Sequence, residues 1–219
     1  MFVNREDAGR KLAAALLHYK NEQPCILALP RGGVPVAVEV AKALNAPIDL
    51  VLVRKIGAPS QPELAVAAVV DGKRPELVVN QRFLDELGID DRFIAREESR
   101  QLREIERRRD LYLAGRDRLN VAGKTAIIID DGIATGATVR AAIYATRRAN
   151  PKRIVVATPV APVQTVEALR READDVVCLE THEDFGAIGF YYRDFTQLSD
   201  EEVRRLLAAA TAHAGAMSA

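Results

Sequence analysis

Short runs of Val, Ile and Leu alternate along this chain with segments of helical periodicity, and this alternation constrains the fold more than any other feature. The runs are CILALP at 25–30, IDLVLVRK at 48–55, TAIIID at 125–130, KRIVVATP at 152–159 and DVVCLE at 175–180. Strands this continuously apolar are typical of parallel sheets covered by helices on both faces. We therefore expect an α/β fold: a doubly wound, mainly parallel sheet flanked by helices and joined by right-handed crossovers.

Helical patterns occupy 5–20, 34–45, the segment after 138, 163–173 and a stretch that begins near Ser199. Asn4 with Asp7 resembles a helix N-cap, and Ser199 with Glu202 resembles a capping box. A length of 219 residues suits one domain. The prediction is a single domain over 1–219 with its core at about 22–180.

Two segments interrupt the alternation. LAVAAVV at 64–70 and PELVVN at 75–80 flank DGKR, which predicts a hairpin, and GAPSQPE at 57–63 reads as a loop with two prolines. Residues 81–118 are charged and helical, with one stop at Leu87-Gly88, and form a predicted helical insertion. The basic run at 107–109 reads as the solvated face of that helix, because glutamates balance it. Residues from about 181 to 219 form a tail.

The composition excludes several classes of protein. Lys and Arg number 31, as do Asp and Glu, and this balance argues against a nucleic-acid partner. Cys25 and Cys178 lie in apolar runs with neither disulfide nor zinc spacing, as is usual in a reducing compartment. No apolar run has the length of a membrane span. We expect a cytoplasmic protein without a membrane partner.

The stretch IIIDDGIATGAT at 127–138 carries the chemistry. A strand runs into Asp130 and Asp131, and Thr135-Gly136-Ala137-Thr138 then opens a helix, where free backbone N–H groups and the helix dipole favour a phosphate. Carboxylates repel phosphate, so the two acids should contact sugar hydroxyls or a hydrated cation. Helix capping explains one acid but not both. The motif predicts a sugar-phosphate ligand.

Other phosphate and hydrolase motifs do not fit. Gly123-Lys124-Thr125 imitates the end of a P-loop but enters a strand instead of leaving one. No G-x-G-x-x-G follows a strand, and no G-x-S-x-G occurs. A receiver domain would carry its acid pair earlier in the chain.

The segment 127–138 resembles the 5-phosphoribosyl-1-diphosphate (PRPP) motif of type I phosphoribosyltransferases. PRGG at 30–33 looks like the pyrophosphate loop of that family, Val53-Arg54-Lys55 like its basic strand end, and the proline-containing segment after Lys55 like its mobile catalytic loop. The order and spacing of these four segments match those of the family over roughly 22–180. PRGGVPVA, RKIGAP and ETHEDF with YYRDF look most similar to a bacterial branch whose substrate is generally unassigned.

The resemblance implies an enzyme that transfers phosphoribosyl from PRPP to a nitrogenous base or amine, with Mg²⁺ held mainly by PRPP and further by Asp130 and Asp131. It implies catalytic roles for Asp130, Asp131, Arg54 and Lys55. It also implies a cis peptide bond at Pro30–Arg31. The residues implied in PRPP binding are Arg31, Gly32, Gly33, Asp130, Asp131, Gly132, Ala134, Thr135, Gly136, Ala137 and Thr138.

The acceptor is less constrained. Ala134 stands where 6-oxopurine enzymes of the family carry an aspartate, which disfavours hypoxanthine and guanine. Phe190 and Tyr191 belong to an aromatic cluster in the tail that could stack a planar base, or could equally form a small core that holds the tail. Three further matters stay open: a non-catalytic PRPP or nucleotide sensor, a hydrolase or phosphorylase-like activity, and a homodimer.

Overall fold

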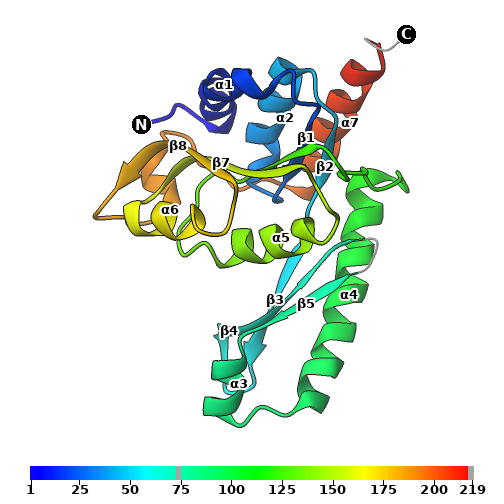
Figure 1. Cartoon of the computed structure of the whole chain (residues 1–219), viewed down its shortest axis with the longest axis vertical. Coiled ribbons are helices and arrows are strands. Elements are labelled where there is room, and N and C mark those ends of the chain that lie inside the picture. Colours follow the sequence, from blue (N-terminus) through cyan, green and yellow to red (C-terminus); the bar gives the residue numbers. More distant parts are fainter. Residues whose placement is uncertain (73–74, 217–219) are drawn as a thin grey trace.

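The computed structural model describes residues 1–72 and 75–216. At its centre lies a five-stranded sheet with the strand order β2-β1-β6-β7-β8, in which every neighbouring pair is parallel (Figure 1). Its strands are β1 (Pro24–Ala28), β2 (Ile48–Leu50), β6 (Thr125–Ile129), β7 (Arg153–Pro162) and β8 (Asp175–His182). Every residue of β1 and β6 is buried. The predicted α/β fold with a parallel sheet is confirmed.

Helices cover both faces of this sheet, as Figure 1 shows. One face carries α1 (Arg5–Leu16), α2 (Gly33–Leu44) and α7 (Asp200–Ala216), and the other carries α5 (Ala137–Arg147) and α6 (Val163–Leu169). Side chains alternate between the faces of a strand, so Ile26 of β1 packs in the α1–α2–α7 core while Leu27 packs in the α5–α6 core.

The sheet has a switch point between β1 and β6. From β1 the chain passes through α2 to β2 on one side, and from β6 it passes through α5 to β7 on the other side. The two connections lie on opposite faces and lead apart, and in open α/β sheets this arrangement leaves a crevice beyond the carboxyl ends of the two strands. Ligands of open α/β sheets bind at such points.

The run at 48–55 is not one strand, contrary to the sequence prediction. It divides into β2 and β3 (Val53–Ala58), and β3 belongs to a separate antiparallel sheet with β4 (Gln61–Val70) and β5 (Glu76–Val79). The chain leaves the parallel sheet because the carbonyl oxygen of Leu52 accepts a hydrogen bond from Asp71 N at 2.8 Å, so Leu52 pairs with the end of β4.

The prediction of a loop at 57–63 is also wrong. β3 continues to Ala58 and β4 starts at Gln61, so Pro59-Ser60 alone forms the turn. The hairpin predicted from 64–70 and 75–80 is confirmed by the antiparallel pairing of β4 with β5. Lys73 and Arg74 of its predicted turn lie outside the described residues.

The charged insertion contains α3 (Gln81–Leu87) and α4 (Asp91–Leu113), separated at Gly88 as predicted. α4 is ended by its C-cap residue Ala114, which has a φ of 47°. Residues 114–118, which the sequence predicts to be helical, are therefore not part of a helix. Ile94, Ile105 and Tyr112 form the buried stripe of α4. Figure 1 shows α4 running alongside the antiparallel sheet and back to the core.

Both predicted terminal helix caps are present. Asn4 Oδ1 accepts from Asp7 N at 2.9 Å, and α1 is followed by the 3-10 turn η1 (Leu17–Tyr19). Ser199 N donates to Glu202 Oε2 at 2.8 Å while Glu202 N donates back to Ser199 Oγ at 3.2 Å. In the described part of the chain, no helix is both long enough and apolar enough to cross a membrane.

Candidate active site

The crevice at the switch point is formed by two loops that meet closely. Leu29 N donates to the carbonyl oxygen of Ile129 at 2.9 Å, just beyond the ends of β1 and β6. A Cβ atom added to Gly32 would overlap Asp131 Oδ2, and one added to Gly33 would lie 2.6 Å from the carbonyl oxygen of Ile129. Only glycine fits at either position, so the structure brings the PRGG loop against the acid pair.

Two helices begin at this crevice. α2 starts at Gly33, and α5 starts after Gly136, which has a φ of 76° and offers no side chain as a cap. Thr165 Oγ1 donates to the carbonyl oxygen of Ala134 at 2.7 Å and so fixes the turn. Thr135 and Ala137 are exposed and Thr138 is half-buried. Ala137 N donates to Thr135 Oγ1, but only at 3.5 Å. The start of α5 therefore combines helix-dipole charge with weakly engaged backbone donors, as an anion site requires. The Pro30–Arg31 peptide bond is cis, as implied.

Asp131 is already engaged by residues near both ends of the chain. Arg5 Nε donates to Asp131 Oδ2 at 2.6 Å, and the two side chains are only 11% and 10% exposed. The hydroxyl of Tyr192 donates to the main-chain oxygen of Asp131. Asp131 thus serves as an anchor for α1 and for the tail.

Asp130 has a different environment. It is half-buried, and its Oδ1 accepts from Asp131 N at 2.9 Å. Burial raises the pKa of Asp130 well above the usual carboxyl range, and the neighbouring Asp131 charge raises it further while Arg5 opposes the shift. The two adjacent acids are therefore not equivalent.

Arg31 of the PRGG loop lies near the start of α7. Its Nη1 is 3.6 Å from Asp200 Oδ1, and the hydroxyl of Tyr112 donates to the same oxygen at 2.6 Å. Burial and the bond to Asp200 raise the pKa of Tyr112 to about 12. The loop, α4 and α7 meet at this carboxylate.

Arg54 and Lys55 lie elsewhere. Arg54 Nε donates to Gln101 Oε1 of α4 at 3.1 Å, and burial lowers the pKa of Arg54. Lys55 is exposed. Among the described residues no hydrogen bond or ion pair joins Arg54 or Lys55 to the acid pair, so their catalytic roles stay a prediction.

The tail covers the motif. A Cβ atom on Gly132 would overlap the side chain of Ile188, which belongs to the 3-10 turn η2 (Ile188–Tyr191). The two aromatic candidates for the acceptor differ: the Tyr191 ring stacks on Phe185, with centroids 5.0 Å apart, whereas Phe190 is 73% exposed. Tyr191 therefore matches the packing interpretation, and Phe190 offers the freer aromatic face of the two.

Sequence reasoning missed Arg5, and it placed Tyr192 only in the aromatic tail segment YYRDF, without a link to Asp131. The two residues are 126 and 61 positions away from Asp131 in the chain. A lone arginine in the first turn of a helix normally signals nothing more than a solvated side chain. No local signal could have linked either residue to Asp131.

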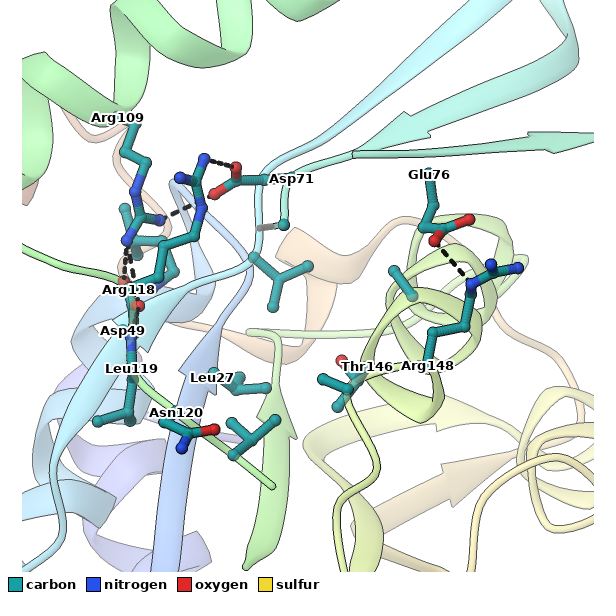
Figure 2. A pocket seen from close by; sticks show the side chains of 16 residues that line it. Leu27, Asp49, Asp71, Glu76, Arg109, Arg118, Leu119, Asn120, Thr146 and Arg148 are labelled. Atoms are coloured by element: carbon teal, nitrogen blue, oxygen red, sulfur yellow. Dashed lines mark hydrogen bonds and ion pairs between the residues drawn. The ribbon is translucent and has the colours of Figure 1, made fainter. Parts of the chain in front are cut away.

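A cavity of about 380 Å³ lies away from the crevice, at the base of the antiparallel sheet (Figure 2). The prediction that the whole run 107–109 is a solvated face is wrong for Arg109, which is buried among carboxylates. Arg109 donates to Asp71 at 2.8 Å and lies 3.2 Å from Asp49, and Arg118 also bonds to Asp71. On the opposite wall, Figure 2 shows the pair formed by Arg148, just after α5, and Glu76 of β5. These charged groups pair with one another and join the antiparallel sheet to the core.

The described residues contain no cluster of three or more His, Cys, Asp or Glu side chains that could hold a metal ion by themselves. A cation bound beside Asp130 and Asp131 would therefore need further ligands from a bound molecule or from water.

The comparisons with known proteins agree with this geometry. A family model described as the phosphoribosyl transferase domain matches residues 3–195. A relative from Mycobacterium tuberculosis strain H37Rv, provisionally named a phosphoribosyl transferase, is 45% identical over an alignment 223 residues long that covers 100% of this chain and 50% of the relative. The chain spans about half the length of the curated relatives it matches.

Among solved structures, a protein from Thermus thermophilus superposes with a TM-score of 0.82 and 42% identity, covering 95% of this chain and 98% of that one. A protein from Aquifex aeolicus, with a TM-score of 0.51 and 10% identity over 84% of this chain and 78% of that one, shares the fold alone. With the family model covering most of its length, this chain belongs to the phosphoribosyl transferase domain family.

Proposed function

We propose that this chain transfers the 5-phosphoribosyl group of PRPP to a nitrogenous base or amine and releases pyrophosphate. The observation that carries the proposal is the crevice at the switch point, where the PRGG loop, the acid pair and the uncapped start of α5 lie together. PRPP has three chemically distinct parts: a 5-phosphate, two ribose hydroxyls and a pyrophosphate. The crevice offers a complementary group for each part.

The start of α5 would hold the 5-phosphate, through backbone N–H groups and the hydroxyls of Thr135 and Thr138. Asp130 would accept hydrogen bonds from the ribose hydroxyls, since its carboxylate lacks the cationic partner that Asp131 has. Arg31 and the N–H group of Gly32 would hold the pyrophosphate, whereas Gly33 N already donates to the carbonyl oxygen of Leu29 at 3.0 Å.

In this reaction the bond between ribose C1 and the pyrophosphate oxygen breaks, and a bond between C1 and the acceptor nitrogen forms. The sugar passes through an oxocarbenium-like state, so no protein nucleophile is needed. Negative charge builds up on the departing pyrophosphate, and donors fixed near it lower the barrier most. Arg31 and the Gly32 N–H group would supply such donors. PRPP phosphates would hold Mg²⁺, and Asp130 would contact the ion through a bound water molecule. The ion would then neutralise part of the charge on the departing pyrophosphate.

The acceptor would bind at the tail side of the crevice. Phe190 is 73% exposed and belongs to the turn whose Ile188 contacts Gly132 of the motif, so its ring is the candidate acceptor face. A planar base can stack on such a ring, and base–aromatic stacking contributes roughly 1–3 kcal/mol per base. This favours an aromatic nitrogenous base over an aliphatic amine.

A second candidate is a non-catalytic PRPP or nucleotide sensor. The observation that favours it is the position of Arg54, which is bound to α4 and not directed at the acid pair. A sensor would bind PRPP in the same crevice without turnover.

The decisive experiment is a screen of nitrogenous bases and amines for pyrophosphate release from PRPP with Mg²⁺. One acceptor class should give turnover, and Asp130→Asn should reduce kcat/KM by about 100-fold, because a charge-assisted hydrogen bond contributes roughly 1.5–3 kcal/mol. Asp117→Asn, a change at an exposed aspartate, is the matched control.

Calorimetric titration with PRPP separates the two candidates. If PRPP binds but no acceptor causes release of pyrophosphate, the protein is the sensor. Failure to bind PRPP at all would exclude the transferase and a PRPP sensor, and would leave only a nucleotide sensor.

A further inference from the structure

We propose that Arg5 is a positioning residue of this site: it fixes Asp131 as the anchor of a cap built from the N-terminal segment and the tail segment that precedes α7, and it leaves Asp130 as the acid that meets the ribose. The cap comprises residues 1–5 and 188–196. The inference rests on the proposed function, and its experiment includes a measurement that is independent of turnover.

The first observation is the set of contacts of the Arg5 guanidinium. Its Nε donates to Asp131 Oδ2 at 2.6 Å and its Nη1 donates to the carbonyl oxygen of Thr196 at 2.9 Å. Its Cζ lies 3.9 Å from the centroid of the Phe195 ring. A planar guanidinium can make two directed bonds and a stacking contact together, whereas a lysine ammonium cannot.

The second observation is that the two segments of the cap pair through their backbones. Phe2 N donates to the carbonyl oxygen of Tyr191 at 2.8 Å, Arg193 N donates to that of Phe2 at 2.9 Å, and Asp194 N donates to that of Val3 at 2.9 Å. The N-terminal segment and the tail are thus one unit. Arg5 belongs to this unit and reaches out of it to the motif.

The third observation is that the cap is held at Asp131 twice. Arg5 binds the carboxylate and the Tyr192 hydroxyl binds the main-chain oxygen. The carboxylate also fills the space beside Gly32, where a Cβ atom would overlap its Oδ2. Asp131 therefore has little room to receive a ribose hydroxyl while the cap is docked.

Charge explains why an arginine is needed. Two adjacent carboxylates that are shielded from water repel each other, and a buried carboxylate without a cationic partner is strongly unfavourable. Arg5 neutralises Asp131, so Asp130 can face the crevice without a second free anion beside it. Phe190 lies in the same cap, so Arg5 also links the ribose acid to the acceptor face.

The experiment compares Arg5→Gln and Arg5→Lys with Arg10→Gln, a matched change at an exposed arginine of the same helix. We expect Arg5→Gln to raise KM for PRPP and for the acceptor and to lower kcat/KM by about 100-fold, the usual effect of a ~1 Å misplacement. Arg5→Lys should recover part of this loss, because it keeps the charge but not the planar fork. Arg10→Gln should behave as wild type. All assays are run at temperatures where circular dichroism shows each variant folded.

A second measurement follows hydrogen exchange of the amides at 188–196 without substrate. In Arg5→Gln these amides should exchange at least about 10-fold faster, while those of β6 are unchanged. Unchanged exchange of the cap would overturn the proposal even if the protein proves to have no transferase activity. Normal KM values in a folded Arg5→Gln enzyme would overturn it while leaving the proposed function intact.

Discussion

At the scale of residues, the two acids of the motif should respond to substitution in opposite ways. Asp130 has a raised pKa because it is shielded from water beside another acid, so its ionised form opposes folding. Asp131 neutralises Arg5, so its loss leaves a buried cation without a partner. We predict that Asp130→Asn raises the melting temperature near neutral pH, with an effect on the order of 1 kcal/mol. Asp131→Asn should lower stability by about 3–5 kcal/mol.

The pH dependence follows from the direction of the Asp130 shift. A raised pKa means that the folded state holds the proton more tightly than the unfolded state does. The penalty is absent below the ordinary carboxyl pKa of 3.8 and grows as pH rises through the folded-state pKa. The advantage of Asp130→Asn over wild type should therefore be larger at pH 8 than at pH 4, measured by thermal unfolding. An advantage that shrinks with rising pH contradicts the assigned environment.

At the scale of elements, the base of the antiparallel sheet is a polar joint. Asp71, at the end of β4, accepts from Arg109 of α4 and from Arg118, and its side chain is only 3% exposed. We predict that Asp71→Asn destabilises the protein by about 3 kcal/mol, because two arginines lose a shared anion. Chemical denaturation gives the free energy of unfolding directly. Asp110→Asn, at an exposed aspartate of α4, is the matched control and should stay within about 0.5 kcal/mol of wild type.

The ion pairs around Asp71 also bear on how a mobile segment could close over the candidate site. The segment 57–63 was expected to be a loose loop, but it forms the tip of the β3–β4 hairpin, where Ala58 and Pro59 line a small cavity with Gly88 and Phe93 of the insertion. Because the tip is part of the β3–β4 ladder, we expect closure over the crevice to carry the antiparallel sheet and the adjoining helices about the Asp71 joint.

At the scale of the whole molecule, the sequence predicts best those strands and helices whose apolar residues follow a regular pattern. Continuously apolar strands such as TAIIID indicate burial on both faces, and the acid pair with Gly136 indicates a helix start that binds anions. The split at Val51-Leu52 was not predictable, since the apolar run continues through it and only the distant Asp71 redirects the chain. Arg5 was missed for the same reason: its partner lies 126 residues away.

The two sheets should also differ in how cooperatively they unfold. β1, β6 and most of β7 are fully buried, whereas β5 is at best half-buried. The antiparallel sheet joins the core through ion pairs around Asp71 as well as through buried side chains of β4 such as Val66 and Val70. Burial of apolar surface dominates local stability, so the antiparallel sheet should open at lower free energy than the parallel one. Native-state hydrogen exchange should show β3–β5 amides exchanging by a sub-global opening and β1 and β6 amides only by global unfolding.

PRPP with Mg²⁺ should slow exchange of the β3–β5 amides if this unit closes over the crevice. Equal protection of both sheets would mean that they fold as one unit, and the closing motion would then lose its physical basis.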